Sequence, residues 1–129
     1  MSDRYTIRVR YVECDPMGVA HHSVYPVWFE MGRTELLRST GVAYAALEEA
    51  GILLAVVTLE VTYRKPAHYD DLLEIDTQLV DCGRVKIEHR YTLRRDGETL
   101  ATARTVLACI GGDGRPVEVP SILRGAANA

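Results

Sequence analysis

The residues best suited to chemistry lie in one short stretch near the N-terminus, which contains Asp15 and the adjacent histidines His21 and His22. The proline after Asp15 disfavours helical angles at the acid, so we expect extended backbone there, and Gly18 lets the chain turn. A helix is expected to begin near Ser23, a good N-cap residue, with free amides in its first turn. A carboxylate close to these amides pairs a base or nucleophile with a site for developing negative charge, which suits acyl transfer.

The elements that must position this stretch follow from the spacing of apolar residues. The spacing predicts a long helix over about residues 24–39, apolar on more than one side, and a short helix over residues 42–50. Gly32 inside the long helix suggests that something packs closely against it. Alternating patterns predict one strand before the stretch, with Tyr11 as its last inward residue, and four antiparallel strands between residues 57 and 110. Tyr63 ends the inward set of the first of these four strands, and the inward set of the third begins at Val85 and includes His89. Asp96 and Gly97 predict a tight hairpin between the last two strands.

A highly apolar helix beside five strands is buried most economically if the sheet curls around it. The predicted fold is therefore α+β: a five-stranded antiparallel sheet wrapped around a long central helix, which looks like a hot-dog fold. At 129 residues the chain is expected to be one domain, 1–129, in which about residues 112–129 form a partly loose tail.

The composition excludes several functional classes. A formal net charge of −3 and a pI near 5.8 argue against a general nucleic-acid binder. No apolar run approaches the ~18–20 residues that span a bilayer, and the N-terminus has no signal-peptide character, so we expect a cytoplasmic protein.

The cysteines and histidines do not suggest a metal centre. Cys14, Cys82 and Cys109 are an odd number with no metal-like spacing, which favours free thiols. Asp15 should raise the pKa of the neighbouring Cys14, which opposes a thiolate nucleophile there and favours a packing role. Adjacent histidines are expected to point apart, and no second ligand cluster is present, so no metal is expected.

Residues 14–25, Cys-Asp-Pro-Met-Gly-Val-Ala-His-His-Ser-Val-Tyr, resemble the 4-hydroxybenzoyl-CoA thioesterase family, above all its small bacterial acyl-CoA thioesterases of the YbgC type. The family pattern is an acid, two spacers, a glycine, and a His or Tyr at the helix start followed by an aromatic residue. The match continues through residues 29–35. A second match, Tyr-Arg-Lys-Pro-Ala-His-Tyr-Asp-Asp at residues 63–71, corresponds to the segment that leads into the family's third strand and implies a structural role. The resemblance extends to about residue 110.

The resemblance implies hydrolysis of an acyl-CoA thioester without a metal or organic cofactor, coenzyme A being part of the substrate. It implies that Asp15 acts as nucleophile or as base for water, and that a backbone N–H around His22 polarises the carbonyl. In YbgC-type members the matching histidine side chain is also considered catalytic. The resemblance further implies a homodimer or homotetramer in which the site lies at the protomer interface. Cys14 departs from the pattern, since many relatives have Thr there.

Alternatives stay open for individual residues. If it is not catalytic, Asp15 only caps the helix, and His22 is then an ordinary residue at the helix start. His21 is expected to be a structural or interface residue, and Tyr25 is equally well explained as a core aromatic. An acidic protein that binds a polyanion needs local positive charge, although a solvated strand face explains any single cation equally well. The expected substrate-binding residues are Gly18, Val19, Tyr25, Arg64, Lys65, Arg84 and Lys86. Of the cations, Arg84 is favoured because it lies in a turn where relatives contact CoA.

Three functions compete on this reading. The first is a thioesterase acting on a small or medium acyl-CoA. The second is a non-catalytic hot-dog module that binds acyl-CoA or a partner and uses Asp15 only as a cap. The third, a hydratase or dehydratase, ranks last because that chemistry pairs a histidine base with an acid from another segment. The sequence identifies neither the acyl group nor the tetramer arrangement.

Overall fold

A computed structural model of the chain describes residues 1–41, 44–121 and 123–124. These residues form two α-helices, two short 3-10 helices and six strands. In chain order the elements are β1 (Ser2–Arg8), η1 (Tyr11–Glu13), η2 (His22–Val24), α1 (Tyr25–Ser39), α2 (Tyr44–Glu49), β2 (Leu53–Tyr63), β3 (Leu72–Cys82), β4 (Lys86–Arg95), β5 (Glu98–Ile110) and β6 (Pro116–Val117). This is the α+β composition that the sequence predicts. The predicted residues 42–43 of the short helix lie outside the described residues.

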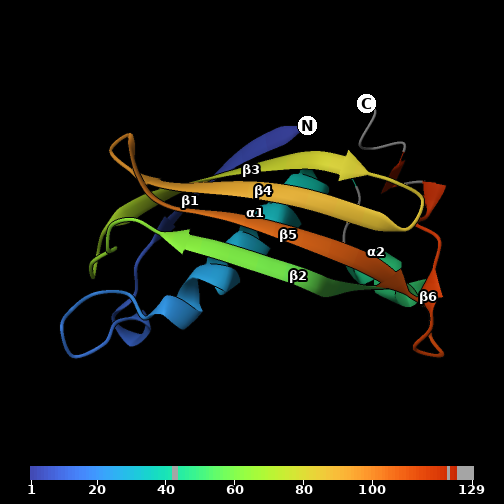
Figure 1. Cartoon of the computed structure of the whole chain (residues 1–129), viewed down its shortest axis with the longest axis horizontal. Coiled ribbons are helices and arrows are strands. Elements are labelled where there is room, and N and C mark those ends of the chain that lie inside the picture. Colours follow the sequence, from blue (N-terminus) through green and yellow to red (C-terminus); the bar gives the residue numbers. More distant parts are fainter. Residues whose placement is uncertain (42–43, 122, 125–129) are drawn as a thin grey trace.

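The strands form one antiparallel sheet in the order β1-β3-β4-β5-β2, and β6 pairs with the end of β5. In this order β1 and β2 are the two edges of the sheet. The sheet lies across α1, as Figure 1 shows. The predicted hairpin joins β4 to β5. Asp96 and Gly97 have φ angles of 50° and 81°, the positive values that a type I′ turn requires at both central residues.

Helix α1 packs on the inner face of the sheet, mainly against β1 and β3. Its residues Trp28 and Phe29 are fully buried among inward side chains of β3 and β4, such as Leu73 and Leu93. Gly32 faces β3, and a Cβ atom built there would lie 2.5 Å from Thr77 Oγ1 and 3.0 Å from Ile75 Cγ2. The close packing expected at this glycine is therefore present.

A second apolar cluster lies at the other end of the sheet, and residues after β5 complete it. Val119 and Leu123 are buried there against Ile87 and Leu107, and the N–H of Val119 donates to the carbonyl of Arg84. The sequence did not indicate this packing or strand β6. The partly loose tail stays a prediction for residues 125–129, which lie outside the described residues.

Two residues expected on inward strand positions lie elsewhere. Strand β1 ends at Arg8, and Tyr11 begins the 3-10 helix η1 with 80% of its surface exposed. Val9 is the last residue of this segment that bonds to the chain before β3, since its N–H donates to the carbonyl of Asp71 and its carbonyl accepts from the N–H of Asp70. Val85 is exposed because it lies in the turn before β4. Among the described residues, no helix is both long and apolar enough to cross a bilayer.

Candidate active site

The turn that carries Asp15 is closed by backbone hydrogen bonds. The N–H of Gly18 donates to the carbonyl of Asp15 at 3.0 Å, and the N–H of Asp15 donates to the carbonyl of Val19 at 2.9 Å. Gly18 has a φ of +78°, a left-handed conformation that glycine adopts without strain. Cys14 and Ala20 form a β-bridge on the inner side of the turn, so the chain returns directly toward α1.

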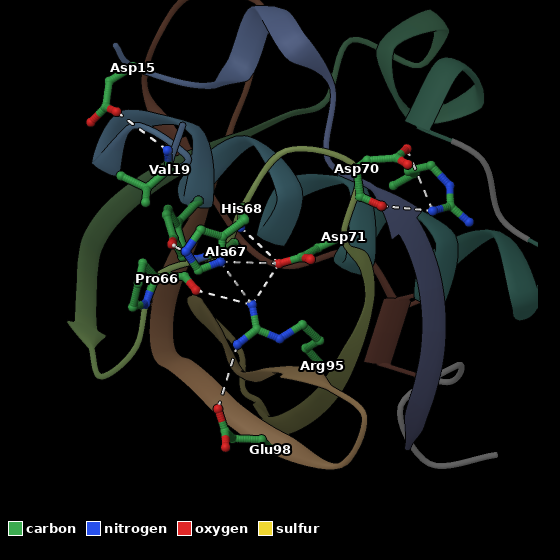
Figure 2. A network of polar contacts seen from close by, with 11 residues as sticks. Asp15, Val19, Pro66, Ala67, His68, Asp70, Asp71, Arg95 and Glu98 are labelled. Carbon is green, nitrogen blue, oxygen red and sulfur yellow. Dashed lines mark hydrogen bonds and ion pairs between the residues drawn. The ribbon is translucent and has the colours of Figure 1, made fainter. Parts of the chain in front are cut away.

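The carboxylate of Asp15 is oriented by this turn through one oxygen only. Oδ1 accepts a hydrogen bond from the N–H of Met17 at 2.9 Å. It also accepts from the N–H of Val19 at 3.4 Å, as Figure 2 shows. Oδ2 has no hydrogen-bond donor within the described part of the chain, and the side chain is half-buried on the wall of a groove. The acid is thus held in place while one oxygen stays open to a ligand.

The helix start differs from the expected cap. Ser23 lies within the 3-10 helix η2, which precedes α1 and has His21 as its N-cap: the Nδ1 of His21 accepts from the N–H of Ser23 at 3.2 Å and lies 2.7 Å from Ser23 Oγ. The N-cap of α1 itself is Val24, which makes no side-chain cap hydrogen bond. The carbonyl of His21 accepts from the N–H of Val24. The N–H of His22 finds no acceptor in the described residues, so it is the first free amide at this helix start.

The rings of His21 and His22 do not point apart, which corrects the sequence-based expectation. Their centroids lie 4.2 Å apart, because the chain bends from extended backbone at His21 into the 3-10 helix. Among the residues that the structure describes, no group of three or more His, Cys, Asp or Glu side chains could hold a metal ion. The absence of a cofactor stays a prediction.

A groove of about 380 Å³ brings the acid and the helix start together. Its lining residues are Asp15, Ala20, His21, His22, Tyr25, Tyr63, Arg64, Lys65 and Pro66. Five of them were predicted from the sequence, namely Asp15, His22, Tyr25, Arg64 and Lys65.

Tyr63 lines the groove, and the sequence analysis did not include it among the candidate site residues. Its hydroxyl donates to the carbonyl of His22 at 2.7 Å, which fixes the peptide group at the start of the helix. Burial, and to a lesser extent the nearby Tyr25, raises the pKa of Tyr63, so it stays a hydrogen-bond donor. The alternating pattern identified Tyr63 as an inward strand residue, but its partner lies 41 residues away in the chain.

Two predicted cations lie away from the groove. Arg84 and Lys86 flank the turn between β3 and β4, at the end of the sheet opposite to the Asp15 turn (Figure 1). Arg84 Nε lies 3.4 Å from Glu118 Oε1 there. Gly18 and Val19 shape the turn without lining the groove. Among the described residues that line the groove, Arg64 and Lys65 are the only lysine or arginine side chains.

The second matching segment forms a platform behind the Asp15 turn. The N–H of Ala20 donates to the carbonyl of Ala67 at 2.8 Å, and the N–H of Tyr69 donates to the carbonyl of Gly18 at 3.2 Å. The N–H of Ala67 donates to the hydroxyl of Tyr25. Tyr25 is therefore both a core aromatic, 3% exposed, and part of the groove wall.

Asp71 and Arg95 hold this platform, as Figure 2 shows. Asp71 Oδ2 accepts from Arg95 Nη1 at 2.6 Å and from the N–H of His68 at 2.8 Å. Arg95 Nη1 also donates to the carbonyl of Pro66 at 3.3 Å. Burial would raise the pKa of Asp71, but the hydrogen bonds from His68 and Arg95 outweigh it and lower that pKa. Asp71 is therefore ionised at neutral pH and fixes the loop.

Cys14 is not activated as a nucleophile. Burial and the nearby carboxylates of Glu13, Asp15 and Asp71 raise the pKa of its thiol, in the direction that the sequence predicts. Its side chain packs against the main core behind the acid.

The comparison with protein families agrees with this geometry. A model described as the thioesterase-like superfamily matches residues 9–126. The chain belongs to this superfamily. It is 35% identical to a putative acyl-CoA thioesterase, YneP, of Bacillus subtilis over 77% of this chain and 72% of the relative. It is 32% identical to the acyl-CoA thioesterase YbgC of Haemophilus influenzae over 95% and 91% of the two chains.

The fold is confirmed by a solved structure of a thioesterase. A 4-hydroxybenzoyl-CoA thioesterase bound to 4-hydroxybenzoyl-CoA superposes with a TM-score of 0.89 over 98% of each chain, at 21% identity. The predicted family, hot-dog fold and enzyme class, a thioester hydrolase, are thus confirmed.

Proposed function

We propose that the protein hydrolyses a small or medium acyl-CoA thioester in this groove, with the carboxylate of Asp15 as nucleophile or general base. The observation that carries this proposal is the pairing of two open groups on one groove, Asp15 Oδ2 and the N–H of His22. The carboxylate oxygen either attacks the carbonyl carbon or takes a proton from the attacking water, and the N–H stabilises the negative charge on the carbonyl oxygen by donating a hydrogen bond to it.

The chemistry has two routes that share these groups. Asp15 either attacks the thioester carbon to form an anhydride that water hydrolyses, or removes a proton from a water that attacks directly. In both, the carbonyl oxygen becomes an oxyanion near the His22 amide, and its collapse breaks the C–S bond and releases the thiolate of CoA. Because a thiolate leaves readily, a carboxylate is a sufficient nucleophile or base. One oxyanion donor is worth about 10²–10³ in rate.

Arg64 and Lys65 are proposed to contact the CoA phosphates. They lie at the groove, and Arg64 makes no ion pair within the described residues, whereas Lys65 Nζ lies 3.1 Å from Glu98 Oε2. In a protein with a net charge of −3, such local cations are needed to bind a polyanion.

A dimer is proposed to complete the site. The edge strand β2 exposes apolar side chains, among them Leu53, Val57 and Leu59, which are 46–57% exposed. If two β2 strands pair antiparallel across a twofold axis, the far end of one sheet lies at the groove of the other. The partner subunit's Arg84 and the partner subunit's Lys86 are then candidates for further phosphate contacts.

The deciding experiment measures free thiol released from a panel of acyl-CoAs by the wild type and by Asp15→Asn. We expect kcat to fall at least about 10²-fold because the amide is neither a base nor a nucleophile. Asp70→Asn is the matched control, since Asp70 lies outside the groove, where its carboxylate pairs with Arg8. It should leave turnover unchanged.

The same assay separates the competing functions. Equal turnover by Asp15→Asn and the wild type would refute the catalytic role of the acid. Binding of acyl-CoA without turnover by the wild type would favour the non-catalytic module, and water addition to an enoyl-CoA would favour a hydratase. Turnover that persists in a chelator would support the prediction that no metal takes part. The cytoplasmic location stays a prediction.

A further inference from the structure

Glu13 carries a buried carboxylate close to the Asp15 turn, and the proposed reaction does not use this carboxylate. The residue is only 6% exposed, and each of its two carboxylate oxygens accepts a hydrogen bond. Oε1 accepts from the N–H of Arg10 at 2.8 Å, and Oε2 accepts from the indole Nε1 of Trp28 at 2.9 Å. Arg10 Nη2 adds a longer contact to Oε2 at 3.4 Å. Removing a carboxylate from water is costly unless such bonds replace the lost hydration, so a specific role is indicated.

The partners of Glu13 belong to the two parts that must meet in the groove. Glu13 ends η1, two residues before Asp15, while Trp28 lies in the first turns of α1. The backbone carbonyl of Glu13 also accepts from the N–H of His21 at 2.9 Å. His21 is the residue that caps the helix start and precedes the free amide of His22. One residue therefore contacts the arm that carries the acid, the helix cap and the helix itself.

We propose that Glu13 is a positioning residue for hydrolysis: its carboxylate fixes the distance between Asp15 and the His22 amide by tying the acid's arm to Trp28. This inference rests on the proposed function, since it assigns how the two reacting groups are held. Asp15 is held within its own turn only through Oδ1, so the turn as a whole is free to shift relative to α1 unless its base is anchored.

The electrostatics keep this anchor in place at working pH. Burial by itself would raise the pKa of Glu13, but the hydrogen bonds from the Arg10 N–H, the Trp28 indole and the Arg10 side chain lower it below its usual range. The carboxylate therefore stays ionised and keeps accepting from both sides at neutral pH.

The test substitutes Glu13→Gln. An amide has one acceptor oxygen and an NH₂ group, whereas the two carboxylate oxygens accept from different donors. In either orientation the NH₂ faces the N–H of Arg10 or of Trp28, and one buried donor loses its acceptor. We expect kcat to fall about 10- to 100-fold while KM changes less than about threefold, because misplacement of reacting groups by about 1 Å costs rate more than binding.

Two controls separate positioning from general destabilisation. Glu74→Gln makes the same chemical change on β3, where the side chain is 43% exposed and pairs with Arg4, and should leave kcat unchanged. Val119→Ala removes buried apolar volume in the second cluster, and should lower the unfolding midpoint without lowering kcat at 25 °C.

Trp28 is the sole tryptophan of the chain, so a proton–nitrogen NMR spectrum has one indole N–H resonance. In Glu13→Gln this resonance should move upfield, which shows that the bond has changed, while backbone amide resonances as dispersed as those of the wild type show that the variant is folded. If Glu13→Gln does not fold, Trp28→Phe tests the same link from the helix side and should also lower kcat with KM nearly constant.

The possible outcomes test the positioning role of Glu13 separately from the proposed function. A folded Glu13→Gln with a shifted indole resonance and wild-type kcat overturns the inference, as does a loss confined to KM. Wild-type kcat in Trp28→Phe overturns the link to the helix. A wild type without turnover on any acyl-CoA would instead overturn the proposed function.

Discussion

His89 is a buried base at a position where the folded chain disfavours a positive charge. It is 8% exposed on β4, as its inward strand position predicts, and its Nδ1 has no hydrogen-bond partner within the described residues. Burial, and to a lesser extent the charge of Arg33, lowers the pKa of His89 from 6.5 to about 4. Tyr91 and Thr105, its other polar neighbours on the inner face, bond to each other through their hydroxyls.

This shift makes stability depend on pH in a defined window. Above pH 6.5 the imidazole is neutral in both states; between pH 6.5 and 4 the unfolded chain binds a proton that the folded chain does not. The free energy of unfolding should therefore fall as pH falls, by about 3 kcal/mol in total. Urea unfolding between about pH 5.5 and 7 measures the upper part of this slope, above the range where Glu13 and Asp71, whose pKa values are lowered from 4.5 and 3.8 on folding, take up protons in the unfolded chain.

Variants identify the histidine responsible. In His89→Leu the slope in this window should largely disappear, whereas His68→Gln, at an exposed histidine, should keep it. An unchanged slope in His89→Leu would show that another group causes the dependence.

At the scale of the elements, the closest contact between α1 and β3 depends on Gly32. Both residues that a Cβ atom would meet, Thr77 and Ile75, are at most 1% exposed and have little room to move. Helix propensity alone predicts that Gly32→Ala stabilises the protein by about 1 kcal/mol. Overpacking typically costs about 1–3 kcal/mol.

We expect the packing term to exceed the propensity term, so Gly32→Ala should lower the free energy of unfolding by up to about 2 kcal/mol. Denaturant unfolding measures it, with Arg38→Ala on the exposed side of the same helix as a control expected to change stability little. A variant as stable as the wild type would mean that β3 yields at this contact.

Elements whose signals are local could be predicted from the sequence. The strands of alternating residues, the helix over residues 24–39 and the Asp96–Gly97 hairpin depend on neighbours in the chain, and all three are present. The features that were missed depend on distant partners. Tyr63 reaches the groove through the carbonyl of His22, and Val119 is held by the carbonyl of Arg84. One local feature was also missed: the chain enters the 3-10 helix η2 before α1, so Ser23 lies within η2 and His21 is its cap.

At the scale of the whole molecule, the two edges of the sheet differ in chemistry. Strand β1 exposes charged and polar side chains, such as Arg4 and Thr6, whereas β2 exposes Val57 and Leu59. An exposed apolar edge favours pairing with another strand, and a charged edge discourages it. The contrast supports β2 over β1 as the pairing edge of the proposed dimer, and a single charged substitution on β2 tests this proposal.

Leu59→Asp should convert the oligomer to monomer, because a carboxylate on the apolar edge would be buried against the partner strand without a counter-ion. Light scattering coupled to size-exclusion chromatography measures the mass, and Thr6→Asp on β1 is the matched control at the other edge. If the partner completes the site, turnover of Leu59→Asp should fall together with its mass and rise with protein concentration. A wild-type mass equal to one chain, or full turnover by a monomeric variant, would show instead that each groove works alone.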